Sequence, residues 1–171
     1  MRRSGVLLPV TSLPSRFGIG TFSKEAYAFV DFLKEAGQKL WQILPLGPTG
    51  YGDSPYQAFS TFAGNPYLID LEELIENGWL TEEECENTDW GGSKSYVDYE
   101  KMYQRRFPLL RKAYHNSHIA ENAEFIAFCE ENDWWLSDYA LFMAIKDSQG
   151  GASFLEWDAP LKLREPEAIR R

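Results

Sequence analysis

A glycine-rich loop with the sequence GPTGYGDSPYQ occupies residues 47–57 and directly follows the apolar run LWQILPL. Such a loop after a strand often binds phosphate, and Gly47, Gly52 and Ser54 have the spacing of a P-loop. The position that requires a lysine holds Asp53, whose carboxylate would repel the β- and γ-phosphates. This charge argues against a nucleotide site. The pair Gly18 and Gly20 in GIGTFS lacks the third glycine of a dinucleotide fingerprint.

The same loop is chemically suited to an uncharged sugar. Tyr51 and Tyr56 offer flat apolar ring faces, while Asp53, Ser54 and Gln57 offer short hydrogen-bonding groups. A pyranose ring has the complementary surface, with an apolar C–H face and a rim of hydroxyl groups. The alternative is a loop packed by its own aromatic side chains, as in an Ω-loop. The chemistry of the loop leaves these two interpretations open.

Other candidate groups do not form a catalytic or metal site. His115 and His118 lack the further ligands that a metal requires, so we expect a solvated helix end. We expect Cys129, Trp134 and Trp135 to pack in the core. Paired carboxylates would indicate glycoside chemistry, but the sequence nominates neither a general acid nor a nucleophile.

The composition narrows the class of protein. The chain has 171 residues, 44% of them hydrophobic, and a net charge of −9. Because an acidic surface repels nucleic acid and anionic membranes, we expect neither as a partner. The first apolar run, Gly5 to Val10, is too short for a signal peptide, and no run has the length of a membrane span. Two cysteines form no disulfide framework, which predicts a reduced, cytoplasmic protein.

The residue pattern predicts an α/β fold that begins with one β-α-β unit. Apolar runs at 5–10 and 40–46 predict parallel strands buried on both faces. The intervening helix is expected to begin after Ser23 as N-cap and to end at Gly37. Residues 47–67 are expected to form a long loop at the carboxyl end of the second strand, where α/β folds bind ligands.

Beyond residue 70 the pattern becomes helical. A short helix is expected to end at Gly78, and DYEKMYQRRFPLLRKAYH predicts a helix with a kink near Pro108. AENAEFIAFCEEN and WWLSDYALFMAIKD predict two further helices, and Pro166 suits a first helical position. Two parallel strands do not form an independent sheet, so we expect a truncated chain.

Several segments together resemble the 4-α-glucanotransferases, also called amylomaltases or disproportionating enzymes. The resemblance covers nearly the whole chain and is most specific between Trp41 and Leu71. The segments are GVLLPVTSLPS, FLKEAG, LWQILPLGPTGYGDSPYQAFSTFAGNPYLIDL and WWLSDYALFMAIK.

The resemblance implies a (β/α)₈ TIM barrel of the α-amylase clan, of which this chain would hold the N-terminal part. These enzymes transfer a segment of an α-1,4-glucan to another glucan or to glucose, with retention of configuration. An aspartate forms the glycosyl-enzyme, a glutamate is acid and base, and a second aspartate stabilises the transition state. The implied partners are α-1,4-glucans and maltooligosaccharides, and no metal or organic cofactor is implied.

The resemblance also implies roles for individual residues. Tyr56 matches the tyrosine that stacks on the sugar beside the cleaved bond, and Ser54 matches a glucan-contacting serine. Tyr51 and Tyr103 match tyrosines of a second glucan site, and Asp53 and Gln57 would have supporting roles. The family's catalytic carboxylates lie in motifs resembling RIDHFRG, AEDLG and HDN, which this sequence lacks.

The expected organisation therefore has two parts. Residues 1–70 would form the first β-α-β of the barrel with the sugar-binding loop, and residues 71–171 a mainly helical insertion subdomain, truncated at its C-terminus. A complete barrel takes about 250 residues, so the barrel would be incomplete and this chain alone inactive. A non-catalytic glucan-binding module, or a loop with only a packing role, remain the alternatives.

Overall fold

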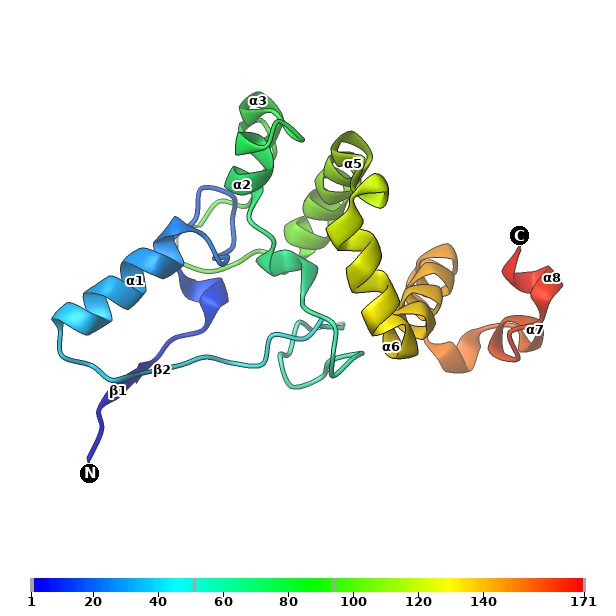
Figure 1. The fold of residues 1–171 in the computed structure, drawn as a ribbon, viewed down its shortest axis with the longest axis horizontal. Helices are drawn as coiled ribbons and strands as arrows, with labels where there is room; N and C mark the ends of the chain where they lie inside the picture. Colours follow the sequence, from blue (N-terminus) through cyan, green and yellow to red (C-terminus); the bar gives the residue numbers. More distant parts are fainter. Residues whose placement is uncertain (1, 51, 94, 171) are drawn as a thin grey trace. The chain divides into compact units, whose positions relative to one another are not determined.

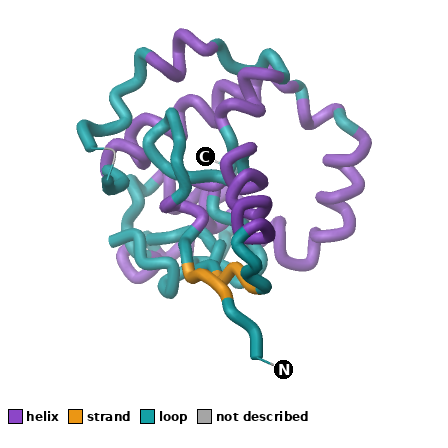
Figure 2. Tube along the Cα trace, turned by 90° about the vertical axis from the view of Figure 1, so that its left-hand side faces the viewer, coloured by secondary structure: helices purple, strands orange, loops and turns teal. Residues whose placement is uncertain are grey.

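The computed structural model describes residues 2–50, 52–93 and 95–170 and divides into two compact units. The first unit spans Met1–Ala120 and the second Glu121–Arg171. Helices and loops dominate both units, and the two strands are short (Figure 2). The expected division at residue 70 stays a prediction.

The first unit begins with the predicted β-α-β arrangement (Figure 1). Strand β1 (Gly5–Leu7) pairs in parallel with β2 (Leu40–Gln42), and Val6 lies opposite Trp41. Helix α1 (Lys24–Glu35) connects the strands. Its first turn is capped by Ser23, whose side chain accepts a hydrogen bond from the Glu25 N–H. Gly37 follows the helix with φ of 72°, so the predicted start and stop signals are confirmed.

Both strands are shorter than predicted, and the prediction that they are buried on both faces is wrong for this chain. Leu7 and Leu40 are 56% and 50% exposed. Beyond the two strands, the Leu8 N–H still donates to the Gln42 carbonyl at 3.0 Å, and Pro9 and Pro45 follow in the two segments. Pro9 precedes a 3₁₀ turn, η1 (Val10–Ser12), which buries Val10.

The core beside the strands is formed where α1 and η1 pack together. Val10, Leu13 and Ala26 are buried, and Phe29 of α1 meets Trp41 of β2 edge to face at 5.0 Å between ring centroids. The Trp41 indole N–H donates to the Leu8 carbonyl at 2.8 Å. These contacts fix the carboxyl ends of both strands.

Gly20 allows the loop after β1 to fold back on η1. A Cβ at this position would lie 2.2 Å from the Val10 carbonyl oxygen and 2.7 Å from the Leu13 nitrogen. Only glycine permits such a close approach of two backbone segments. The GIG sequence therefore has a packing role.

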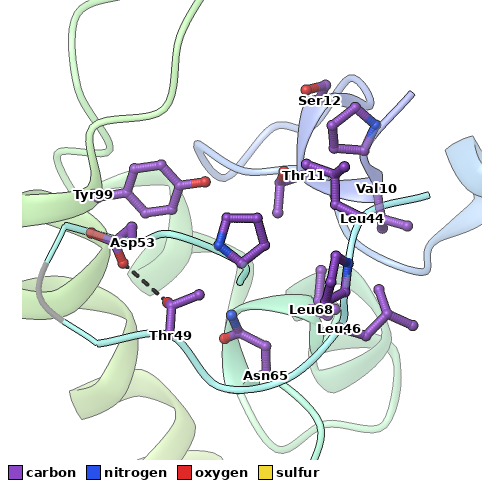
Figure 3. A pocket seen from close by; sticks show the side chains of 13 residues that line it. Val10, Thr11, Ser12, Leu44, Leu46, Thr49, Asp53, Asn65, Leu68 and Tyr99 are labelled. Carbon is purple, nitrogen blue, oxygen red and sulfur yellow. Dashed lines mark hydrogen bonds between the residues drawn. The ribbon is translucent and has the colours of Figure 1, made fainter. Parts of the chain in front are cut away.

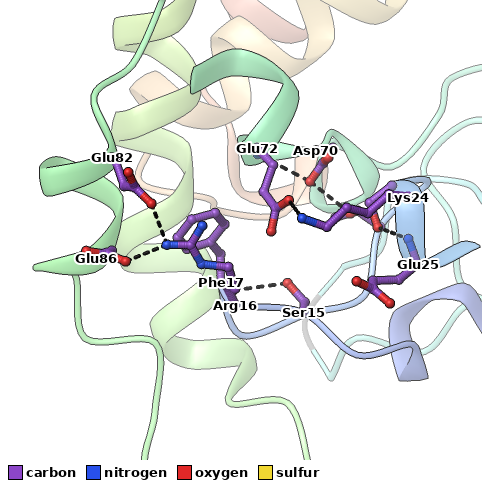
Figure 4. A network of polar contacts seen from close by, with 11 residues as sticks. Ser15, Arg16, Phe17, Lys24, Glu25, Asp70, Glu72, Glu82 and Glu86 are labelled. Carbon is purple, nitrogen blue, oxygen red and sulfur yellow. Dashed lines mark hydrogen bonds and ion pairs between the residues drawn. The ribbon is translucent and has the colours of Figure 1, made fainter. Parts of the chain in front are cut away.

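Short helices follow the long loop. They are η2 (Pro66–Leu68), α2 (Leu71–Glu76) and α3 (Glu82–Glu86). A polar network ties them to the N-terminal segments (Figure 4): Arg16 pairs with Glu82 and Glu86, and Lys24 pairs with Glu72. These side chains are largely exposed except Glu72, so the pairs orient the segments more than they stabilise them.

A continuous helical segment runs from residue 99 to residue 117, as predicted. It consists of α4 (Tyr99–Lys101), the π-helical η3 (Met102–Arg106) and α5 (Phe107–Ser117). Pro108 lies in the first turn of α5, and the π-helical turns directly precede it. The missing proline N–H favours such a local change of hydrogen bonding, so the irregularity expected near Pro108 is present.

Arg106, at the end of η3, is fully buried in the first unit. Its guanidinium donates to the backbone carbonyls of Phe17 and Ile69 and lies over the Trp90 ring at 6.0 Å. Burial lowers the pKa of Arg106 to about 10, so the side chain remains charged at neutral pH. One side chain thus joins the loop after β1, the segment before α2, and η3.

The second unit contains one long helix where two were predicted. Helix α6 (Ala123–Ser148) is continuous, since neither glycine nor proline interrupts it. The short elements η5 (Phe154–Glu156), α7 (Ala159–Lys162) and α8 (Pro166–Ile169) follow, with Pro166 at its predicted position. Trp157 is buried between the rings of Phe142 and Phe154, at 5.2 and 5.3 Å.

Three predictions of core packing fail in this unit. Trp134 is 68% exposed on α6, and Trp135 and Cys129 are only partly buried. The apolar side chains of α6 point to several sides, so one covering layer cannot bury all of them.

In the first unit, Cys85 lies in the core although the acidic segment around it is exposed.

Within residues 2–50, 52–93 and 95–170, no helix combines the length and the apolar character that a membrane crossing requires. The same residues contain no cluster of three or more His, Cys, Asp or Glu side chains able to hold a metal. His115 and His118 lie exposed at the end of α5, as expected.

We predict that Arg106→Met lowers the free energy of unfolding by about 3 kcal/mol, because it leaves the buried Phe17 carbonyl and the partly buried Ile69 carbonyl without this donor. Urea denaturation followed by tryptophan fluorescence measures the change. Arg105→Met, at an exposed neighbouring position, is the control and should change stability by less than about 0.5 kcal/mol. Equal effects of the two substitutions would contradict the anchoring role of Arg106.

Candidate functional site

A pocket of about 250 Å³ lies in the first unit at the carboxyl ends of both strands. Its walls come from the segments after β1 and β2, from the glycine-rich loop, and from the residues around η2 and α4 (Figure 3). Ligands of open α/β sheets bind at this edge, because the loops that follow parallel strands converge there. The position expected for a ligand site is therefore hollow.

The pocket has an apolar side and a polar side. Thr49, Asp53 and Tyr99 lie together opposite the leucine-rich side in Figure 3. The apolar lining includes Val10, Leu44, Leu46 and Leu68, and the polar lining includes Thr11, Ser12, Thr49, Asp53, Asn65 and Tyr99. Such a surface suits a ring with an apolar face and a polar rim.

Local hydrogen bonds close the glycine-rich loop at its base. Thr49 and Ala58 form an isolated antiparallel bridge, and the Phe59 N–H donates to the Pro48 carbonyl at 3.3 Å. Behind the loop, the Asn65 N–H donates to the Leu46 carbonyl at 2.8 Å. The described residues of this segment otherwise form no helix or strand until η2, as the sequence predicts.

Among the residues that the structure describes, Asp53 is the one predicted sugar-contacting residue that lines the pocket. It adopts a left-handed conformation with φ of 50°, which is uncommon for a residue with a side chain. The Thr49 hydroxyl donates to its carboxylate at 3.2 Å. Burial raises the pKa of Asp53, and the hydrogen bond from Thr49 acts in the opposite direction. The carboxylate is thus a partly desolvated acceptor at the pocket wall.

Three other predicted residues that the structure describes, Ser54, Tyr56 and Gln57, are not among the residues that line the pocket. Tyr56 is 73% exposed on the loop, Gln57 is exposed, and Ser54 is partly buried. The Gln57 N–H donates to the Ser54 carbonyl at 3.1 Å, which forms a turn at this end of the loop. Tyr51 lies outside the described residues. The roles predicted for these side chains stay predictions.

Tyr103 lies on η3, apart from the glycine-rich loop in the sequence. Its ring is 58% exposed and meets Phe107 edge to face at 5.7 Å. A solvated ring held from behind by a second ring is available to stack on a ligand. Its predicted part in a second glucan site stays a prediction.

Sequence reasoning missed five polar residues of the pocket. They are Thr11, Ser12, Thr49, Asn65 and Tyr99. Thr11 directly follows the first apolar run, so its position at a strand end was a usable signal. Asn65 and Tyr99 have no such signal, since only tertiary folding brings them to the strand ends.

Comparison with known proteins assigns this chain to a family. A family model described as 4-alpha-glucanotransferase matches residues 8–171. The 4-alpha-glucanotransferase of Thermus thermophilus is 49% identical over 99% of this chain and 34% of the relative. That of Clostridium butyricum is 47% identical over 95% of this chain and 33% of the relative.

A solved structure agrees with the sequence matches. The amylomaltase from Streptococcus agalactiae, in complex with acarbose, superposes with a TM-score of 0.91 at 46% identity. The match covers 99% of this chain and 35% of the solved chain. The present chain therefore spans about a third of the length of its relatives.

We predict that Asp53→Asn raises the urea midpoint at pH 7 and that this gain disappears as the pH falls toward 3.8. Burial raises the pKa of Asp53 above 3.8, so the folded protein loses stability as rising pH ionises the carboxyl group. Asparagine carries no charge, tolerates the left-handed conformation and still accepts the Thr49 hydrogen bond. A midpoint difference that is independent of pH would contradict this account.

Proposed function

The chain belongs to the 4-alpha-glucanotransferase family, and from this membership we propose that it provides the N-terminal, glucan-binding part of such an enzyme. The intact enzyme would transfer segments of α-1,4-glucans to another glucan or to glucose by a retaining double displacement. The observation that carries the proposal is the sugar-sized pocket at the strand ends beside an exposed tyrosine loop. The acarbose complex of the relative from Streptococcus agalactiae supports it.

We propose that residues 1–70 contribute the first two strands of a (β/α)₈ barrel with the sugar-binding loop, and residues 71–171 a mainly helical insertion subdomain. The parallel pairing of β1 with β2 through α1 supports this organisation, because it is the repeating unit of such a barrel. Exposed Leu7 and Leu40 are also consistent with strands that neighbouring strands would cover.

Sugar binding in this proposal depends on stacking and on short polar groups. Tyr56 has an exposed ring on a loop whose base is closed by backbone hydrogen bonds. The ring can therefore cover a sugar face with little further loss of conformational entropy. Ser54, Asp53 and Gln57 would hydrogen-bond hydroxyl groups along the rim. Tyr51 and Tyr103 would hold a second stretch of the glucan.

Catalysis requires groups that this chain does not supply. A retaining mechanism needs two carboxyl groups about 5–5.5 Å apart on either side of the scissile bond. Within the described part of the chain, Asp53 is the only acidic side chain that lines the pocket, and the three carboxylate motifs expected for the family do not occur in the sequence. We therefore propose that the chain alone binds glucan without cleaving it.

We expect Tyr56→Ala to weaken binding of maltoheptaose to this chain about fivefold to tenfold, since a stacked aromatic ring contributes about 1 kcal/mol. Isothermal titration calorimetry gives the dissociation constant. Tyr27→Ala is the matched control, because Tyr27 is also 73% exposed but lies on α1. Unchanged affinity of the Tyr56 variant, or equal loss in both variants, would contradict the stacking role.

A chimeric enzyme distinguishes the proposed function from the alternative, a non-catalytic glucan-binding module. Residues 1–171 replace the matched third of the Thermus thermophilus relative, and glucose released from maltotriose is measured. We expect release by the chimera and none by the 171-residue chain alone. A folded chimera that binds maltoheptaose without releasing glucose would favour the binding module instead. Release by the chain alone would contradict the proposed lack of catalytic groups.

A further inference from the structure

Tyr103 carries an exposed ring on a firmly held piece of backbone. It lies in the π-helical η3 between Met102 and Arg106, which are both fully buried. Met102 packs so closely on the loop after β1 that a Cβ at Gly18 would lie 2.5 Å from its Cε atom. The Arg106 guanidinium donates to two backbone carbonyl groups. The backbone is therefore anchored on both sides of Tyr103, while its side chain stays 58% exposed.

Phe107, four residues later at the start of α5, links the Tyr103 ring to the core. The two rings meet edge to face, with 5.7 Å between centroids and an interplanar angle of 70°. Phe107 also packs on Tyr67, at 5.6 Å and 53°. Tyr67 is 5% exposed and belongs to the same buried cluster as Met102. Three rings thus form a row of contacts that begins in the core and ends at the exposed Tyr103.

This arrangement leaves the Tyr103 ring both ordered and accessible. An edge-to-face contact uses at most one face of a ring, so at least one face of Tyr103 is not covered by Phe107. A ligand that stacks on a ring must otherwise restrict its rotation, and this loss of side-chain entropy weakens binding. A ring that is already held by its neighbour avoids most of that loss.

We propose that Phe107 is a positioning residue of the glucan site: it holds the Tyr103 ring in one orientation, so that the ring can stack on a sugar without first being ordered. The inference rests on the proposed glucan binding and adds to it a residue that sequence reasoning did not nominate. Phe107 acts through Tyr103 and needs no contact with the sugar, as supporting residues do in a preorganised site.

The first test removes the ring at residue 107 of the 171-residue chain and then restores it. Phe107→Leu keeps an apolar side chain beside Tyr67 but no ring beside Tyr103, so maltoheptaose should bind about threefold more weakly by isothermal titration calorimetry. Phe107→Tyr retains the ring and should recover most of the affinity. If the leucine variant binds as tightly as the original chain, or if both variants lose affinity equally, the inference is overturned.

A matched control separates positioning from a general loosening of the core. Phe17 is 2% exposed, packs on Trp90 at 6.1 Å in a different core cluster, and is not among the residues that line the pocket. Phe17→Leu should lower the urea midpoint at least as much as Phe107→Leu but leave the dissociation constant for maltoheptaose unaltered. Affinity is measured in buffer where urea denaturation shows each variant to be folded. Equal losses of affinity in the two variants would contradict a positioning role.

A double-mutant cycle tests whether Phe107 acts through Tyr103. Tyr103→Ala should weaken binding of maltoheptaose, and Phe107→Leu should add little to that loss in the Tyr103→Ala background. Additive losses in the dissociation constant would refute the inference. If Phe107→Leu does not fold, Phe107→Met takes its place, because the flexible methionine side chain fills irregular core space without supplying a ring.

The outcomes distinguish this inference from the proposed function. If Tyr56→Ala weakens binding and Phe107→Leu does not, glucan binding stands and the positioning role of Phe107 is refuted. If Tyr103→Ala leaves the affinity unchanged, the inference fails while binding through Tyr56 is unaffected. If the original chain does not bind maltoheptaose, both are refuted. Weaker binding in the Tyr56, Tyr103 and Phe107→Leu variants, with a non-additive cycle, supports both.

Discussion

The buried guanidinium of Arg106 is the constraint on which the arrangement of the first unit depends. It donates to backbone carbonyls of Phe17 and Ile69, which belong to segments far from it in sequence. Removing a guanidinium from water is costly, and the Nε atom has no hydrogen-bond partner among the described residues. The two carbonyl groups and the Trp90 ring replace water around the guanidinium, and the side chain thereby joins the loop after β1 to the segment before α2.

The glycine-rich loop combines a closed base with the exposed ring of Tyr56. Arg106 holds the chain before α2, and the hydrogen bonds of Asn65 and Phe59 hold the end of the loop. Tyr56 can therefore remain in water without a packing partner that a sugar would have to displace. Under the proposed function, the net charge of −9 would not oppose binding of a neutral sugar, because stacking and hydroxyl contacts do not depend on net charge.

Local features were predictable from the sequence, and features that depend on distant neighbours were not. Ser23 and Gly37 mark the ends of α1 because capping involves only adjacent residues. The burial of β1 and β2 was mispredicted because it depends on neighbouring strands, of which the described residues contain none. Within the pocket, Asp53 was found from its loop, whereas Tyr99 was missed because a helix start 46 positions later carries no sign of the strand ends.

The bridge between Thr49 and Ala58 has a consequence for how the surface of the loop can change. The bridge holds the two ends of the loop together. The entropy cost of closing the loop is therefore offset by contacts at its base and does not depend on the residues at its tip. Substitutions between the pinned residues then alter the surface offered to the ligand while the strands and α1 keep their packing. The sequence between Thr49 and Ala58 can therefore vary, in evolution or by design, with little effect on the stability of the first unit.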